Sequence, residues 1–223
     1  MGYRLAALVG VLGIVAATAL AAATPVMPPP GAYIKTPVFS WTLPANEQSD
    51  ALYIADKPDT TAAGMFVEGN VVRAHAFTND DETTWSPSAP LYAGRYWWLV
   101  SSRDHNTSEL YHSAPSDFTI ELSFEFDHAK VRRSPSQHWL RLTPHWSGNM
   151  RAVRFKLSIL RHGRIIWARR GLMRNHIGSR GSVSFTWHRP HTVKQGTVLT
   201  LREGISVPGT SAGAGDFFSV RAP

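Results

Sequence analysis

Short runs of alternating apolar and polar residues constrain the fold of this chain more than any other feature. The clearest run covers residues 153–159 and reads VRFKLSI. Successive side chains of a β-strand point to opposite faces, so a period of two is typical of a strand with one buried face. Similar runs recur along the chain between turn-forming residues, and no segment after residue 23 shows a 3.6-residue apolar stripe. The pattern predicts an all-β chain of antiparallel sandwiches.

The predicted strands divide into five runs in the first half and seven in the second. The runs of the first half are 38–43, 51–55, 65–77 with a break at Gly69 and Asn70, 95–101 and 118–122. The runs of the second half are 124–126, 138–142, 153–159, 165–167, 183–187, 198–201 and 217–220. His162 and Gly163 lie between two of these runs, and we expect them to form a tight hairpin turn in which Gly163 has a positive φ.

Residues 1–23 have the pattern of an export signal. The single cation Arg4 precedes an uncharged run rich in Ala, Val and Leu. This predicts a signal peptide, cleaved after Ala21 or Ala23; an uncleaved membrane anchor is the alternative, because the run nearly spans a bilayer core. Both place the remaining chain outside the cytoplasm, secreted or at the cell envelope. Residues 24–34 follow as a proline-rich linker that we expect to be stiff and extended.

Charge divides the rest of the chain in two. Residues 31–121 hold five Lys and Arg against twelve Asp and Glu, whereas residues 122–223 hold seventeen against four, within a total net charge of +7. This asymmetry predicts an acidic domain over 35–121 and a basic domain over 122–223, whose potential favours anionic partners. The chain has no Cys, which excludes a disulfide scaffold, a thiolate metal site and a thiol nucleophile.

Three segments of the acidic half resemble fibronectin type III-like domains. Residues 91–100 (LYAGRYWWLV) resemble the corner in which a Leu and a Tyr brace the turn into the sixth strand, although Ala93 stands where the family usually has Pro. Residues 37–41 (PVFSW) followed by 51–53 (ALY) resemble the second and third strands, in which a buried Trp packs the two sheets together, and residues 113–120 resemble the last strand. The resemblance implies an immunoglobulin-like β-sandwich, which in exported bacterial proteins is usually a spacer or binding module. Residues 122–223 match no motif, and their alternation alone predicts a second immunoglobulin-like sandwich.

The best candidate binding patch is rich in arginine. A guanidinium recognises phosphate or carboxylate through a planar fork, and an adjacent Trp offers a stacking surface. The members are Arg161, Arg164, Trp167, Arg169, Arg170, Arg174 and Arg180. The ligand expected is an anionic envelope polymer, with nucleic acid disfavoured by export and a membrane involved only if the leader is kept. A solubilising arginine-rich face is the alternative.

Other candidate sites are weaker. Trp97 points away from the predicted core, so it could contact a partner, although burial by the second domain is favoured. His188 and His191 could ligate a metal, but the surroundings are basic and the pair resembles an ordinary turn. Glu125 and Asp127 share a strand face, and residues 80–82 form an acidic loop; a solvated surface is the simpler interpretation of both.

The sequence therefore predicts an exported binding protein that is not an enzyme and has no cofactor. In the first hypothesis the basic domain holds an anionic envelope polymer. In the second, both domains are structural or adhesin-like parts of an extracellular protein assembly. A remote third hypothesis is an enzyme using a histidine-bound metal.

Overall fold

The computed structural model describes residues 22–79, 81–134, 136–178 and 180–223, so nearly all of the predicted leader lies outside the described residues. Among the described residues no helix is long and apolar enough to cross a membrane. The described residues of the first half form nine strands and one short 3-10 helix. They are β1 (Thr24–Met27), β2 (Ala32–Ile34), β3 (Phe39–Thr42), β4 (Glu47–Ala55), η1 (Glu68–Asn70), β5 (Val71–Ala76), β6 (Thr84–Trp85), β7 (Gly94–Asp104), β8 (Leu110–His112) and β9 (Ser116–Ile120).

In the part of the second half that the structure describes there are eight strands. They are β10 (Phe124–Ser134), β11 (Trp139–Gly148), β12 (Ala152–Arg161), β13 (Arg164–Arg174), β14 (Gly181–Ser182), β15 (Phe185–His188), β16 (Val198–Ser206) and β17 (Gly213–Arg221). The all-β prediction is confirmed. His162 and Gly163 form the β12–β13 turn with φ values of 48° and 76°, so the predicted hairpin is also confirmed.

The strands of the first half form two facing sheets. One has the order β1-β3-β6, and the other has the order β2-β9-β7-β4-β5, with β8 also paired to β7. The main core lies between them and includes Phe39, Trp41, Leu52, Trp98 and Phe118, all 3% exposed or less. The alternation of β4 and β7 creates this core, because their alternate residues face the smaller sheet.

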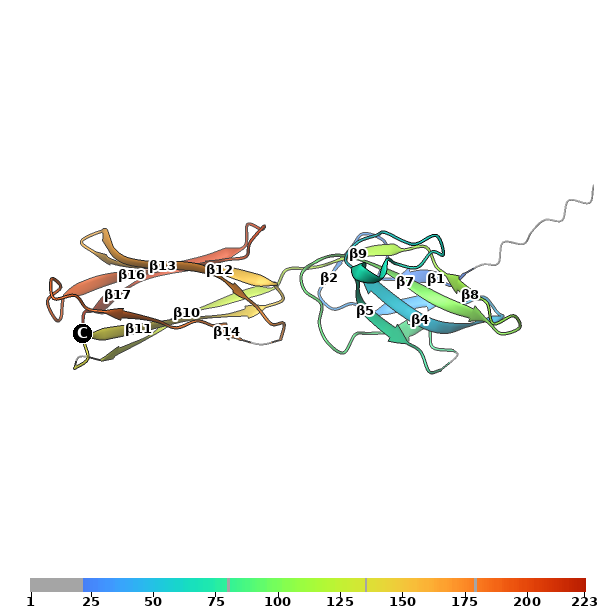
Figure 1. Cartoon of the computed structure of the whole chain (residues 1–223), viewed down its shortest axis with the longest axis horizontal. Helices are drawn as coiled ribbons and strands as arrows, with labels where there is room; N and C mark the ends of the chain where they lie inside the picture. The colour runs from blue at the N-terminus through green and yellow to red at the C-terminus, as the bar shows by residue number, and fades with distance from the viewer. Residues whose placement is uncertain (1–21, 80, 135, 179) are drawn as a thin grey trace, which may run out of the picture.

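The strands of the second half form a second pair of sheets. One has the order β10-β11-β14, with β15 also paired to β11, and the other has the order β13-β12-β16-β17. Leu140, Ile159, Trp187 and Leu199 pack in the core between them. Figure 1 shows the two pairs of sheets as two bodies placed end to end, and no described strand pairs across the boundary. Independent folding of the 35–121 and 122–223 segments stays a prediction.

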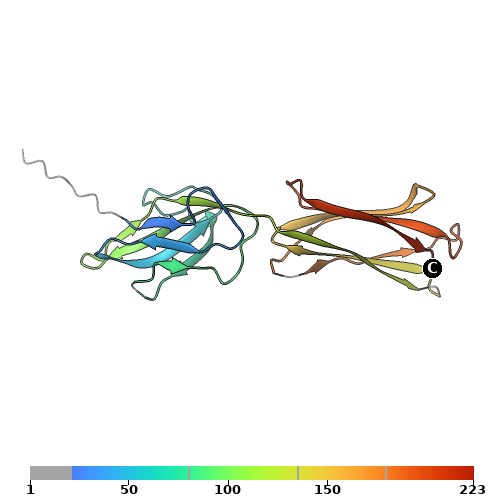
Figure 2. The same ribbon diagram turned by 180° about the vertical axis from the view of Figure 1, so that it is seen from behind.

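The two bodies meet through a few polar contacts near residues 121–123. The Asn149 side chain donates from Nδ2 to the Glu121 carbonyl oxygen (2.7 Å) and accepts from the Ser123 amide (2.8 Å). The Ala93 amide donates to the Asn149 carbonyl oxygen (2.8 Å). Figure 2 shows the same end-to-end arrangement from behind. These contacts lie at the tips of the sheets and leave the broad sheet faces of the second half uncovered by the first.

The prediction that residues 24–34 form a linker is wrong. β1 pairs with β3, and β2 pairs in parallel with β9, so this segment supplies strands to both sheets of the first half. Ala23, just before β1, is 3% exposed within the core. Proline lacks an amide donor and is tolerated at sheet edges. β1 is an edge strand, which explains how a proline-rich segment fits, and residues 28–31 carry the chain from one sheet to the other.

The corner suggested by the family resemblance is present. The Tyr96 hydroxyl donates to the Tyr92 carbonyl oxygen (2.9 Å), and Leu91 and Tyr96 are buried. A tyrosine at the start of the sixth strand that bonds back to the chain just before it is a hallmark of immunoglobulin-like sandwiches. Burial raises the pKa of the Tyr96 hydroxyl, against the opposing effect of Arg151. Ala93 in place of the usual proline is therefore compatible with the corner.

The strand boundaries differ from the prediction where polar residues extend a strand. β10 continues to Ser134, and β4 begins at Glu47. Only residues 185–187 of the predicted run 183–187 lie in a strand, β15, while β14 covers the two residues before the run; both strands pair with β11. Hydrogen bonds to neighbouring strands determine where these strands begin and end, and the alternation of apolar residues does not reveal those ends.

Candidate functional site

The strongest candidate site is the outer face of the sheet β13-β12-β16-β17. In β12, Val153, Phe155 and Leu157 are buried, while Arg154 and Lys156 between them are exposed. The same alternation runs through β16 and β17, so one face of the sheet packs on the core and the other faces solvent. The alternation of residues 153–159 therefore fixes the direction of the Arg154 and Lys156 side chains.

Strand register shows which outer residues are neighbours, because directly paired residues of antiparallel strands share a face. Three adjacent rows cross the sheet from β13 to β17. They are Leu172, Arg154, Ser206 and Gly213; then Arg170, Lys156, Gly204 and Gly215; then Ala168, Ser158, Arg202 and Phe217. Arg174 extends the face at one end, paired with Ala152, and Arg221 extends it at the other, paired with Val198. We call these residues the outer face.

The outer face is cationic without a compensating acid. It holds Arg154, Lys156, Arg170, Arg174, Arg202 and Arg221. Glu203 and Asp216, the acids of these strands, are paired on the inner face. Glu203 is 4% exposed, and its two carboxylate oxygens accept from the Ala129 amide at 3.2 and 2.9 Å. Within the described part of this sheet, no carboxylate projects to the outer face, so the positive potential there is not neutralised locally.

A shallow depression lies in the middle of the outer face. Two adjoining hollows of about 260 and 380 Å³ share Lys156 and Gly204 in their linings. The first hollow is also lined by Arg202, Glu203, Gly215 and Phe217, and the second by Arg154, Phe155, Arg170, Ile205 and Ser206. The depression forms because Gly204 and Gly215 have no side chains, so the space between the neighbouring cationic side chains stays open. Phe217 at its rim is 60% exposed, with the Arg202 guanidinium 5.2 Å from the ring centroid.

The predicted arginine patch does not form one surface. Arg170 and Arg174 lie on the outer face. Trp167 and Arg169 lie on the other side of β13, where Trp167 packs on the core and the Arg169 guanidinium lies 5.5 Å from its ring centroid. Alternation along β13 separates these neighbours in sequence onto opposite faces.

The remaining predicted patch residues lie at other places. Arg161 and Arg164 pair at the tip of the β12–β13 hairpin, where Arg161 donates to the Thr192 carbonyl oxygen (3.1 Å). Arg180 forms an ion pair with Asp127, on the opposite sheet. These residues do not join Arg170 and Arg174 in one site.

Sequence reasoning missed Arg154, Lys156, Arg202, Gly204 and Phe217. Their positions between buried residues of the alternating runs indicated that they share an outer face within each strand. The pairing of β12 with both β13 and β16 brings them together. That pairing depends on contacts distant in sequence, so the separate runs did not identify the cluster.

Trp97 is not covered by the second half, contrary to the favoured interpretation. It packs in a second cluster of the first half with Phe66 and Leu99, and the Arg95 guanidinium lies 5.0 Å from its ring centroid. Leu99, on the same side of β7 as Trp97, is 0% exposed. Residues 56–67 fold over this side of the sheet and bring Phe66 onto it. Trp97 therefore contributes to the interior of the first half more than to a free partner surface.

The weaker sequence candidates show no common site. His188 lies on β15 and His191 in the following turn, and among the described residues no group of three or more His, Asp or Glu could hold a metal ion. Glu125 accepts from the Ser147 hydroxyl at 3.2 Å, in keeping with a polar surface position. In the acidic loop, Asp80 lies outside the described residues.

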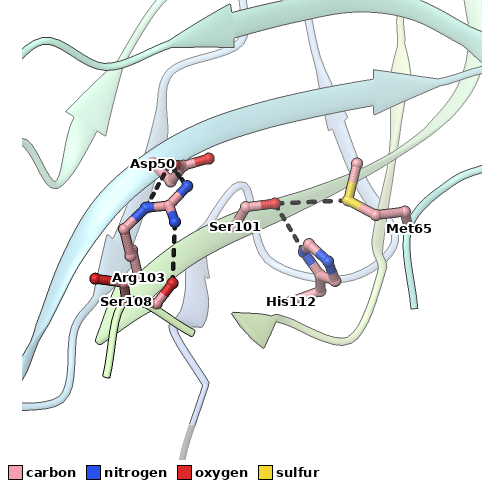
Figure 3. Close-up of polar contacts among 6 residues, drawn as sticks. All are labelled: Asp50, Met65, Ser101, Arg103, Ser108 and His112. Carbon is pink, nitrogen blue, oxygen red and sulfur yellow. Dashed lines mark hydrogen bonds and ion pairs between the residues drawn. The ribbon is translucent and has the colours of Figure 1, made fainter. Parts of the chain in front are cut away.

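A serine and a histidine meet on the first half. The Ser101 hydroxyl lies 2.8 Å from His112 Nδ1 and 3.6 Å from the Met65 sulfur. Figure 3 shows this cluster apart from Asp50, whose carboxylate accepts from Arg103. Ser101 is 1% exposed, so its hydroxyl cannot reach a substrate in this conformation. Burial lowers the pKa of His112, although Asp50 opposes the shift. The arrangement is that of a buried polar contact.

Comparisons with known proteins give only distant likenesses. No family model and no curated protein matches the chain. A chicken interferon gamma receptor alpha chain is 7% identical with a TM-score of 0.30, covering 92% of this chain and 100% of that one. Dimeric latent PorU from Porphyromonas gingivalis is 12% identical with a TM-score of 0.32, and the match covers 92% of this chain and 21% of that one. A DUF3823 family protein from Bacteroides ovatus is 8% identical with a TM-score of 0.32, and the match covers 78% of this chain and 87% of that one. These values identify no function.

Proposed function

We propose that this chain is an exported, non-enzymatic binding protein that holds an anionic polymer of the cell envelope on the outer face of its second half. The observation that carries the proposal is the absence of carboxylates from that face in the described structure, alongside Arg154, Lys156, Arg170 and Arg202. A polymer with repeated negative charges can contact several of these cations at once, which multiplies weak individual interactions.

The opposite sheet differs in charge. Its strands also carry cations, including Lys130, Arg132 and Arg141, but Glu125 and Asp127 project from them. Mixed charges reduce the net potential and repel parts of an anionic chain. The end-to-end contacts of the two halves also leave the outer face accessible, because they involve residues near 92–93, 121–123, 149 and 175.

The direct test measures retention of the full-length purified protein on immobilised polygalacturonate and inorganic polyphosphate, with neutral dextran as the blank. The test variant combines R154Q, K156Q and R170Q. The control variant combines K130Q, R132Q and R141Q and removes the same numbers of Lys and Arg from the opposite sheet. We expect about tenfold weaker binding for the test variant and less than about twofold for the control, from the summed loss of three exposed charge contacts.

Ionic strength provides a second measurement on the same samples. Binding should weaken steeply between about 0.05 and 0.5 M salt, because the Debye length falls over this range from about 14 to about 4 Å. Equal losses in both triple variants would indicate attraction by net charge alone and would reject the outer face as the site. Thermal melts of each variant establish that it is folded.

The assembly hypothesis has its own supporting observation. Leu172, Ile165 and Val198 are 61%, 57% and 55% exposed on the strands of the same sheet. Exposed apolar side chains are typical of protein interfaces when they form a contiguous patch. Here cations separate them, which favours the polymer. Concentration-dependent self-association that persists at high salt and is lost in L172S would instead support an assembly.

A further inference from the structure

We infer that the depression at Gly204 selects an acidic polysaccharide, with a sugar ring against Phe217 and its carboxylate near Lys156 and Arg154. This inference rests on the proposed function and specifies the polymer that the outer face accepts. It depends on three observations about the depression: its glycines, its exposed aromatic ring and the position of its cations.

The glycines do not all have a packing explanation. A Cβ atom at Gly215 would lie 2.7 Å from the Glu203 carbonyl oxygen, and one at Gly213 would lie 2.9 Å from the Ile205 carbonyl oxygen. Close backbone approach therefore requires glycine at both positions. A Cβ atom at Gly204 would meet nothing nearer than 4.0 Å. Glycine also weakens a strand interior. The fold itself therefore does not need glycine at position 204, where the missing side chain keeps a space open.

Phe217 provides a surface that a sugar can use and a phosphate chain cannot. Phe217 is 60% exposed on the edge strand β17, with the Arg202 guanidinium 5.2 Å from its ring centroid, beside the open space over Gly215 and Gly204. The face of an aromatic ring is electron-rich and attracts groups with partial positive charge. The C–H groups on one side of a pyranose ring have this character, whereas polyphosphate has no C–H groups.

The cations lie where a carboxylate on such a sugar would reach them. Lys156 is paired with Gly204, which in turn is paired with Gly215 next to Phe217 along the strand. With neighbouring strands about 4.8 Å apart, Lys156 and the β17 edge are separated by about 10 Å. The side-chain-free glycines occupy the interval, and Arg154 and Arg170 flank Lys156. A carboxylated sugar can therefore contact the ring and a cation together.

The test titrates the full-length protein with galacturonate oligomers and, separately, with inorganic polyphosphate of similar charge. The variants are F217A, which removes the ring, and G204V, which fills the depression without changing charge. T200V is the matched control, because Thr200 lies on the same strand and face outside the linings of both hollows. Thermal melts compare the stability of all three variants.

We expect F217A and G204V each to weaken binding of the oligomers by about tenfold, comparable to loss of one aromatic contact. Polyphosphate binding should change by less than about twofold, and T200V should leave both ligands unaffected. Equal losses for the two ligands, or no loss for the oligomers, would overturn the inference. Binding of polyphosphate but not of the oligomers would overturn it while leaving the proposed function intact, and binding of neither would overturn both.

Discussion

The sheet around β7 is covered on both sides, whereas the sheet around β12 is covered on one. Residues 96–100 of β7 form an uninterrupted aromatic and apolar run (YWWLV), while residues 153–157 of β12 alternate (VRFKL). Residues 56–67 fold over the outward side of β4 and β7, burying Leu99 beneath Phe66. The β12–β13 turn consists of His162 and Gly163 and is too short to cover anything. The exposed face of β12 is therefore marked by the cations of its alternating sequence, while the length and course of the connections decide what covers the second face of β7.

The largest expected change in stability comes from placing a lysine on the covered side of the β7 sheet and, for comparison, on the exposed outer face of the β12 sheet. L99K should destabilise the first half by at least about 3 kcal/mol, because an unpaired ammonium would be buried. L172K, on the bare face, should change stability by less than about 0.5 kcal/mol and strengthen retention on polygalacturonate. Denaturant unfolding followed by tryptophan fluorescence measures the first effect. Similar tolerance of both substitutions would refute the difference between the faces.

Truncating a phenylalanine on each face makes the same comparison without charge. Phe66 is 3% exposed and Phe217 is 60% exposed. F66A should cost about 3–5 kcal/mol through the cavity it leaves, whereas F217A should cost less than about 0.5 kcal/mol. The melting temperatures of the two variants provide the measurement. A large loss in F217A would mean that Phe217 is a structural residue rather than a ligand contact.

Two glycines of the second half distinguish a conformational requirement from open space. Gly163 has φ +76° with no neighbour within 4 Å, while a Cβ atom at Gly204 also has room and its backbone is not left-handed. G163A should therefore cost about 1 kcal/mol from backbone strain alone. G204A should be neutral or stabilise by up to about 1 kcal/mol, since alanine reduces the freedom of the unfolded chain. Comparable destabilisation of both would show an unrecognised constraint at Gly204.

The smallest expected effect is a pH dependence confined to the covered face. Burial lowers the pKa of His112 in the folded chain, below the value of about 6.5 in the unfolded chain. The unfolded chain therefore binds more protons, so stability falls as pH decreases through about 6.5. H112Q should reduce this slope between about pH 7.5 and 5.5. Equal slopes in the wild type and H112Q would contradict the assignment.

Local patterns were sufficient for much of the fold. The strand at β7, the alternation in β12, the turn at His162 and the corner at Tyr96 each depend on residues close in sequence, and each was predicted. The strands within residues 24–34 were missed because proline obscured an edge position that only pairing with β3 and β9 reveals. The cover over Leu99 was missed because it requires a contact with Phe66, distant along the chain.

The candidate site was harder to predict because it combines several strands. The sequence drew attention to consecutive cations in β13, but Arg169 and Arg170 lie on opposite faces. Arg154 and Arg202 were each separated from that segment and carried no distinctive motif. Strand order places them together, and that order depends on the packing of the whole second half.

The position of β13 at the edge of its sheet has a consequence for self-association. β13 is eleven residues long and, among the strands that the structure describes, pairs only with β12, so its other side presents backbone groups outside the described ladders. Such edges can template fibrillar aggregation, which natural proteins limit with charged residues. Arg164, Arg169, Arg170 and Arg174 supply like charges along this edge, so two copies that approach edge to edge repel each other. Salt screens that repulsion, and the colloidal stability of concentrated protein should therefore decrease as ionic strength rises.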